Sequence, residues 1–103
     1  MEYSDLDPIL EDFSDRYGLH FSTKYQDEEV RYTLIVDDAG NAFDLWVLCN
    51  GKSIAVSGGD RQIKGRTYGI NTSLVELAEN LEVVYARIEA WIKESGNTRT
   101  PLF

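Results

Sequence analysis

Hydrophobic side chains in the last third of the chain recur at spacings of three and four residues. The members of this series are Leu74, Leu77, Leu81, Val84, Ile88, Trp91 and Ile92. The spacing predicts a long amphipathic helix of about six turns. Ser73 and Glu76 have the spacing of a capping box, which indicates the start of the helix. Gly96 is the expected stop.

A shorter helix is predicted near the N-terminus. Its apolar positions fall on one side at helical spacing and are Leu6, Ile9, Leu10, Phe13 and Tyr17. Ser4 or Asp7 is suited to cap this helix, and Pro8 is suited to its first helical position. Gly18 follows the last apolar position, where a left-handed residue commonly ends a helix.

Between these helices the pattern alternates with a period of two, which predicts strands over residues 19–26, 30–36, 42–49 and 54–56. We expect turns at residues 27–29 and 37–41 and a tight hairpin turn at Asn50-Gly51, with positive φ at both residues. The side chains expected to face inward are Val30, Tyr32, Leu34, Val36, Phe43, Leu45, Val47, Cys49, Ile54 and Val56. Glycines interrupt the pattern from residue 57 onward, and a fifth short strand near residues 67–70 stays open as an alternative.

These elements predict a single α+β domain over residues 1–96, followed by a flexible tail over residues 97–103. The expected architecture is a four- or five-stranded antiparallel meander. The short N-terminal helix and the long C-terminal helix both pack on one face of this sheet.

Charge narrows the classes of partner. The chain of 103 residues has a net charge of −8, which disfavours nucleic acid and anionic membranes and favours a basic protein. Residues 1–50 hold twelve acidic and three basic side chains, whereas residues 51–70 hold four basic and one acidic. The single cysteine fits a reducing compartment, and the N-terminal residues lack the pattern of a secretory signal. We therefore expect a cytoplasmic protein.

The sequence contains no pattern typical of a catalytic centre. His20 is the only histidine, and Cys49 has no second histidine to activate it. Residues 37–41 lack the ligand spacing of a calcium loop. Gly51-Lys52-Ser53 lacks the earlier glycine of a phosphate-binding loop. We therefore expect no catalytic residue, no metal site and no cofactor.

Two groups of residues are candidates for binding a partner. The first is acidic and consists of Asp12, Asp15, Asp37, Asp38 and Asp44, for which the alternative is an ordinary solvated surface. The second is an apolar patch expected on the outer sheet face, formed by Ile35, Trp46 and Leu48 with Asp44 and Arg31 at its rim. The alternative is that the glycine-rich segment or the Leu102-Phe103 tail covers this patch.

The glycine-rich segment carries a third candidate. Arg61, Lys64 and Arg66 follow Gly58-Gly59, and such a loop can bind an anion through main-chain amides and cations. The alternative is a mobile loop.

The leading hypothesis is a protein-binding inhibitor. The oligomeric state, monomer or homodimer, stays open; a monomer favours the inhibitor, and a homodimer favours a secretion chaperone. Bacterial toxin-immunity proteins, which neutralise basic nuclease toxins by occlusion, are an example of such an inhibitor; the analogy rests on size, charge and architecture. The alternatives are a secretion chaperone or adaptor, or an inhibitor from a phage or plasmid that mimics the charge of DNA. A small enzyme is the weakest hypothesis.

Overall fold

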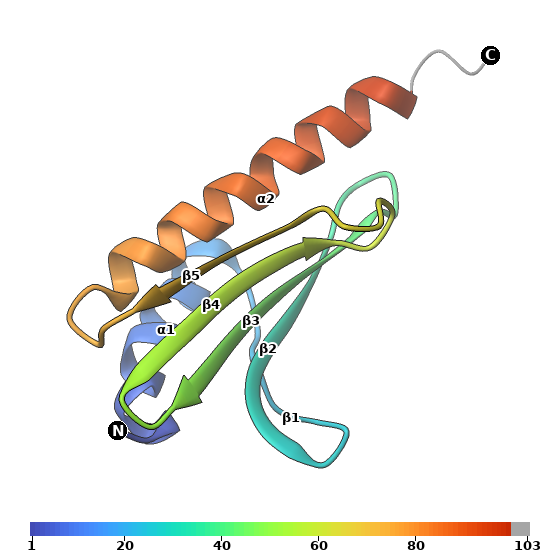
Figure 1. Ribbon diagram of the computed structural model, residues 1–103. Helices are drawn as coiled ribbons and strands as arrows, with labels where there is room; N and C mark the ends of the chain where they lie inside the picture. Colours follow the sequence, from blue (N-terminus) through green and yellow to red (C-terminus); the bar gives the residue numbers. More distant parts are fainter. Residues whose placement is uncertain (100–103) are drawn as a thin grey trace.

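The computed structural model describes residues 1–99, with the side chains of residues 1–95, and confirms the α+β class (Figure 1). The elements in chain order are α1 (Tyr3–Tyr17), β1 (Ser22–Tyr25), β2 (Glu28–Val36), β3 (Ala42–Asn50), β4 (Ser53–Asp60), β5 (Thr67–Thr72) and α2 (Leu77–Arg99). All neighbouring strands pair antiparallel in the order β1-β2-β3-β4-β5. The sheet is therefore a five-stranded meander, and the fifth strand is real.

The two helices lie on the same face of the sheet. Leu6, Leu10 and Phe13 of α1 are buried in one core with the inner faces of β2, β3 and β4. The α2 side chains that join this core are Leu77, Leu81, Val84, Ile88 and Trp91. The predicted period of the long helix is thus confirmed from Leu77 onward. The helix begins at Leu77, so Leu74 and Glu76 lie in the turn before it. None of the described helices contains a stretch that is long and apolar enough to cross a bilayer.

The glycine-rich segment belongs to the sheet, because β4 continues through Gly58 and Gly59 to Asp60. Gly58 lies on the inner face, where a Cβ atom would be 3.0 Å from Ile88 Cδ1 and 3.2 Å from Val84 Cγ1. A glycine there lets α2 approach the sheet closely. The expected break in the strand pattern is therefore a packing contact.

The ends of both helices differ from the prediction. α1 begins at Tyr3, and Asp5 accepts a hydrogen bond from the Glu2 N–H at 2.8 Å, so Pro8 lies inside the helix. At the other end Gly18 has the expected left-handed conformation, with φ of 65°. α2 continues through Gly96 to Arg99, so residues 97–99 are helical. The rest of the predicted tail, residues 100–103, lies outside the described residues.

Two hairpin turns also differ. The β3–β4 turn places Gly51 and Lys52 between the paired residues Asn50 and Ser53, and only Gly51, with φ of 68°, has positive φ. In the β1–β2 turn both Gln26, with φ of 51°, and Asp27, with φ of 69°, are left-handed. This turn lies one to two residues before the predicted position. The turn at residues 37–41 is confirmed.

The two faces of β2 are the reverse of the prediction. Arg31, Thr33 and Ile35 pair with Val47, Leu45 and Phe43, so they share the helix-covered face. Leu34 and Val36 lie on the outer face and are 44% and 58% exposed. The proposed places of Ile35 in the outer patch and of Arg31 at its rim are therefore wrong, because both side chains are buried beneath the helices.

Candidate partner-binding face

Three aromatic rings form a cluster on the outer sheet face, which the helices leave uncovered. We call Tyr25, Tyr32 and Trp46 the aromatic cluster. The centroid of the Trp46 ring lies 4.2 Å from that of Tyr32 and 4.9 Å from that of Tyr25, which meets it edge-on. Such contacts fix the orientation of the indole in addition to burying apolar area. Trp46 is half-buried, so part of the ring faces solvent.

The cluster rests on a small apolar base. Val30 is 6% exposed and Tyr32 is 8% exposed, although neither belongs to the core beneath the helices. The register of β2 and β3 places Val30 beside Leu48 on the outer face, next to the pair of Tyr32 and Trp46. Burial of Val30 and Tyr32 on the outer face adds apolar contacts that stabilise the pairing of β2 with β3.

A polar network borders the aromatic cluster. The Tyr32 hydroxyl donates to Asp44 Oδ1 at 2.5 Å, and Arg61 Nη2 donates to Tyr32 Oη at 2.8 Å. Arg61 Nε lies 3.0 and 3.1 Å from the two oxygens of Asp44. Burial, together with the hydrogen bond to Asp44, raises the pKa of Tyr32 to about 12. Tyr32 is therefore a neutral hydrogen-bond donor at physiological pH. The charges of Asp44 and Arg61 at the border of the aromatic cluster are paired with each other.

Exposed apolar and small side chains extend the face. Leu34, Val36 and Leu48 are more than one-third exposed on β2 and β3. On β4, Ala55 pairs with Leu48, Ser57 with Trp46 and Gly59 with Asp44 on this outer face. Residues 57–60 and 67–69 of the glycine-rich segment are strands of the sheet and do not fold over the patch. Between these strands, Arg61 reaches the border of the patch through Tyr32 and Asp44. The Leu102-Phe103 tail lies outside the described residues.

The structure does not bring the predicted acidic residues together on this face. Asp12 and Asp15 are exposed on α1, in the helix layer on the opposite side of the sheet. Asp38 is exposed in the β2–β3 turn. Asp37 holds that turn, because its carboxylate accepts hydrogen bonds from the N–H groups of Ala39 and Asn41. Of the acidic candidates only Asp44 borders the patch with Trp46 and Leu48.

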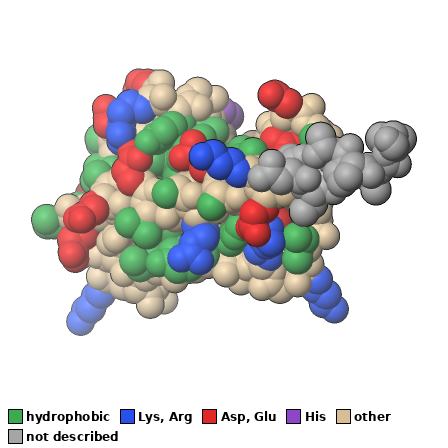
Figure 2. All heavy atoms as spheres, turned by 90° about the horizontal axis from the view of Figure 1, so that it is seen from above, with side chains coloured by type: hydrophobic (Ala, Val, Ile, Leu, Met, Phe, Trp, Pro, Cys, Tyr) green, Lys and Arg blue, Asp and Glu red, His purple; other side chains and the backbone are tan. Residues whose placement is uncertain are grey.

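The acidic side chains of α1 line a separate surface groove. Asp7, Glu11 and Asp15 line a groove of about 310 Å³ together with His20 and Arg31, the ion-pair partner of Asp7. Seen from the side of α2, acidic and basic side chains are interspersed with hydrophobic ones (Figure 2). The acidic excess therefore does not form one continuous patch on that face.

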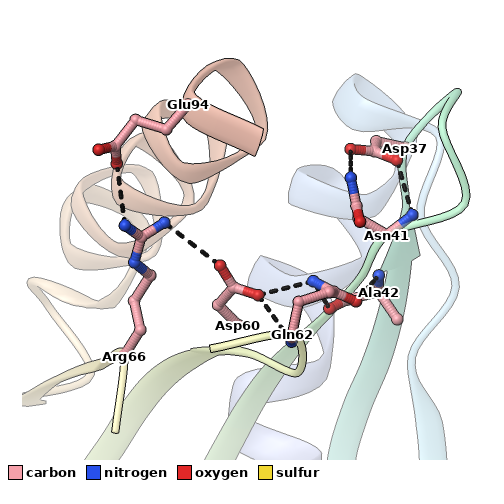
Figure 3. A network of polar contacts seen from close by, with 7 residues as sticks. All are labelled: Asp37, Asn41, Ala42, Asp60, Gln62, Arg66 and Glu94. Carbon is pink, nitrogen blue, oxygen red and sulfur yellow. Dashed lines mark hydrogen bonds and ion pairs between the residues drawn. The ribbon is translucent and has the colours of Figure 1, made fainter. Parts of the chain in front are cut away.

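The cations of the proposed anion-binding loop are mostly engaged within the fold. Arg61 binds Asp44, and Arg66 lies 3.3 Å from Asp60 and 3.5 Å from Glu94 (Figure 3). Gln62 ties the same loop to the start of β3, because its side-chain amide both accepts from and donates to the main chain of Ala42. Lys64 is exposed and has no ion-pair partner among the described residues.

Sequence reasoning missed Tyr25 and Tyr32 as members of the face. The alternation of β2 predicts Tyr32 on the inner face, together with Val30, Leu34 and Val36. The cross-strand pair of Tyr32 with Trp46 is the signal that identifies it, and this pair depends on the register of the strands.

Among the residues that the structure describes, no three His, Cys, Asp or Glu side chains are placed to hold a metal ion. His20 is exposed, and Cys49 is half-buried with its Sγ 3.4 Å from the Met1 carbonyl oxygen. Comparison of the chain with protein-family models, curated proteins and solved structures found no match.

Proposed function

We propose that this chain is a protein-binding inhibitor that docks its outer sheet face on a basic protein. The observation that carries the proposal is the aromatic cluster. Trp46 is part-exposed, yet Tyr25 and Tyr32 hold its ring in one orientation. An aromatic anchor that is ordered before binding loses little conformational freedom on association. Tryptophan and tyrosine are also enriched among residues that dominate binding energy.

The charge of the chain supports a basic partner. The net charge is −8, and Arg16, Arg31, Arg61 and Arg66 are all paired with acidic side chains of the fold. Asp15 and Asp38 have no cationic partner among the described residues. The acidic field would speed encounter with a basic protein, while the apolar patch would provide the contact area.

A toxin-immunity protein is the specific form of inhibitor that we propose. The domain would cover the substrate-binding surface of a basic toxin, for example a nuclease, and so block it without chemistry of its own. This mode of action needs a stable, open surface and no catalytic group.

Affinity capture with matched variants tests the proposal. Immobilised wild-type protein, Trp46→Ala and Leu48→Arg are each used to capture proteins from the native cell lysate, followed by mass spectrometry. Val75→Ala is the control, because Val75 is 93% exposed and lies in the connection between β5 and α2, outside the outer-face patch. We expect wild type and the control to capture the same basic protein and both face variants to lose it. Equal capture by all four proteins would exclude the outer face.

A further inference from the structure

The two edge strands of the sheet differ in how they are protected against pairing with another strand. β1 has four residues, contains Lys24 and has a register irregularity between Ser22 and Lys24. Such features discourage pairing with another chain. β5 has six residues, with no charged side chain, no proline and a regular register along β4. β5 is therefore the edge that is suited to add a strand.

One hydrogen bond fixes the direction of the main-chain groups of β5. The Asp60 N–H donates to the Arg66 carbonyl oxygen at 3.0 Å, just beyond the paired part of β4 and β5. Hydrogen-bonded pairs alternate along an antiparallel ladder. The residues that point their N–H and C=O groups toward β4 are therefore Tyr68, Ile70 and Thr72.

The remaining residues of β5 direct their main-chain groups away from the sheet. They are Thr67, Gly69 and Asn71, and all three are exposed. The Thr67 N–H already donates to the Gly65 carbonyl oxygen at 3.1 Å. Gly69 and Asn71 therefore present a donor and an acceptor each along the open edge.

α2 does not cover this edge. The helix packs on β4, where Ile88 and Val84 approach Gly58. Over β5 the helix extends Arg87, whose guanidinium carbon lies 4.3 Å from the centre of the Tyr68 ring. This contact covers the inner face of β5 and leaves the outward main-chain groups of the strand open.

We propose that the β5 edge binds a second copy of this chain. The two strands would pair antiparallel about a two-fold axis at Ile70, so that Gly69 of each copy exchanges hydrogen bonds with Asn71 of the other. The two half-buried Ile70 side chains would then meet on the helix-covered side. The product is one continuous sheet across both copies.

Charge complementarity favours a second copy over another strand. Lys64, which is exposed and has no ion-pair partner among the described residues, lies just before β5, whereas the exposed Glu76 follows it. Antiparallel pairing of identical strands places the start of one beside the end of the other, so the basic end faces the acidic end twice. β5 also lies at the opposite edge of the sheet from β1 and its acidic turn.

This pairing is independent of the proposed inhibitor function, because it leaves the aromatic cluster uncovered. The interface is a short edge rather than a broad face, so we expect a dissociation constant on the order of 10 μM. Homodimers would therefore form only in concentrated samples.

Sedimentation over a range of concentrations tests the pairing. Asn71→Pro removes an outward N–H without removing a hydrogen bond to β4, and Asn71→Ala keeps that N–H. We expect Asn71→Pro to weaken dimerisation at least about tenfold and Asn71→Ala to change it less than about twofold. Circular dichroism confirms that both variants are folded. A wild-type monomer at every concentration, or equal dimerisation by both variants, would overturn the proposal.

Amide hydrogen exchange locates the interface. We expect the N–H groups of Gly69 and Asn71 to exchange more slowly in concentrated than in dilute samples, with little change at Lys24. A charge-reversal pair gives a second readout: Lys64→Glu and Glu76→Lys should each weaken self-association, and an equimolar mixture should form the heterodimer. Slower exchange at other residues but not at Gly69 and Asn71 would contradict pairing through β5. A mixture that associates no better than either variant alone would contradict it as well.

Discussion

Arg31 of β2 is buried beneath α1, where Asp7 accepts hydrogen bonds from its Nε at 2.7 Å and from its Nη2 at 3.0 Å. The same guanidinium donates to the Val30 carbonyl oxygen and lies 4.7 Å from the centre of the Tyr3 ring. This ion pair fixes α1 to the sheet through two charge-assisted bonds in a planar geometry.

The first prediction concerns the loss of this ion pair. Asp7→Asn removes the nearer of two carboxylates beside the buried Arg31 and leaves only the exposed Glu29, 3.6 Å from Nη1. The loss is costly because the guanidinium stays out of water. Since Asp7 itself is 46% exposed, we expect a loss of roughly 1–3 kcal/mol in the free energy of unfolding. Urea denaturation measures it. Asp12→Asn is the control, because Asp12 is 75% exposed and pairs with an exposed arginine; a loss as large in the control would refute the assignment.

The second prediction is an acid-sensitive contribution from the same pair. The hydrogen bond from Arg31 lowers the pKa of Asp7 below 3.8. A carboxyl group whose pKa is lower in the folded state stabilises the fold above its unfolded pKa, and this contribution is lost as pH falls through the folded pKa. The free energy of unfolding should therefore fall more steeply below about pH 4 in wild type than in Asp7→Asn. Identical slopes would show that Asp7 makes no such contribution.

The Arg31 pair also explains why the faces of β2 were predicted in reverse. One face of β2 holds Val30, Tyr32, Leu34 and Val36, whereas the other holds Arg31, Thr33 and Ile35. Alternation assigns the more apolar set to the core. The structure places the more polar set beneath the helices, where Asp7 from a distant segment pairs with Arg31. The alternation of residues along β2 cannot predict this partner, because Asp7 belongs to α1.

The third prediction concerns the crossing of α2 over the sheet. Gly58→Ala places a methyl group 3.0 Å from Ile88, so we expect a loss of about 1–3 kcal/mol in the free energy of unfolding. Gly59→Ala is the matched control, because its nearest contact is Thr67 Cγ2 at 3.8 Å. That change should be neutral or slightly stabilising. Combining Gly58→Ala with Ile88→Val should cost less than the sum of the single changes; strict additivity would contradict the contact.

Much of the remaining fold was predictable from local patterns. The spacing of Leu77, Leu81, Val84 and Ile88 identified α2 and its buried face. Gly58 was not predictable in the same way, because its role depends on which helix residue crosses that point of the sheet. A glycine pair inside a strand pattern looks like an interruption when only the neighbouring residues are considered.

The fourth prediction concerns the ionisation of Tyr32. Its pKa is raised to about 12, so the phenol stays neutral when an exposed tyrosine ionises near pH 10. The pKa of Tyr32 is raised in the folded state, so its neutral phenol stabilises the fold. This contribution to the free energy of unfolding is present below pH 10 and is lost as pH rises toward 12. The phenolate titration of wild type minus that of Tyr32→Phe should show this late ionisation. A difference curve centred near pH 10 would contradict the buried hydrogen bond to Asp44.

The candidate face was predictable in part. The alternation of β3 placed Trp46, Leu48 and Asp44 on the outer side, and the structure confirms that placement. The neighbours of Trp46 were not predictable, because they depend on the register of β2 and on the left-handed turn at Gln26 and Asp27. The sequence alone places Trp46 on the outer face, whereas the tertiary structure is needed to identify Tyr25 and Tyr32 as its ring contacts.

The most direct test of the outer face is the affinity of the purified captured partner for matched variants. We predict that Trp46→Ala raises the dissociation constant by about 30-fold or more, which corresponds to a loss of about 2 kcal/mol in binding free energy. Asp12→Asn, on the opposite layer, should change it less than about threefold. An unchanged affinity for Trp46→Ala, together with a large loss for Asp12→Asn, would contradict the account and place binding on the helix layer.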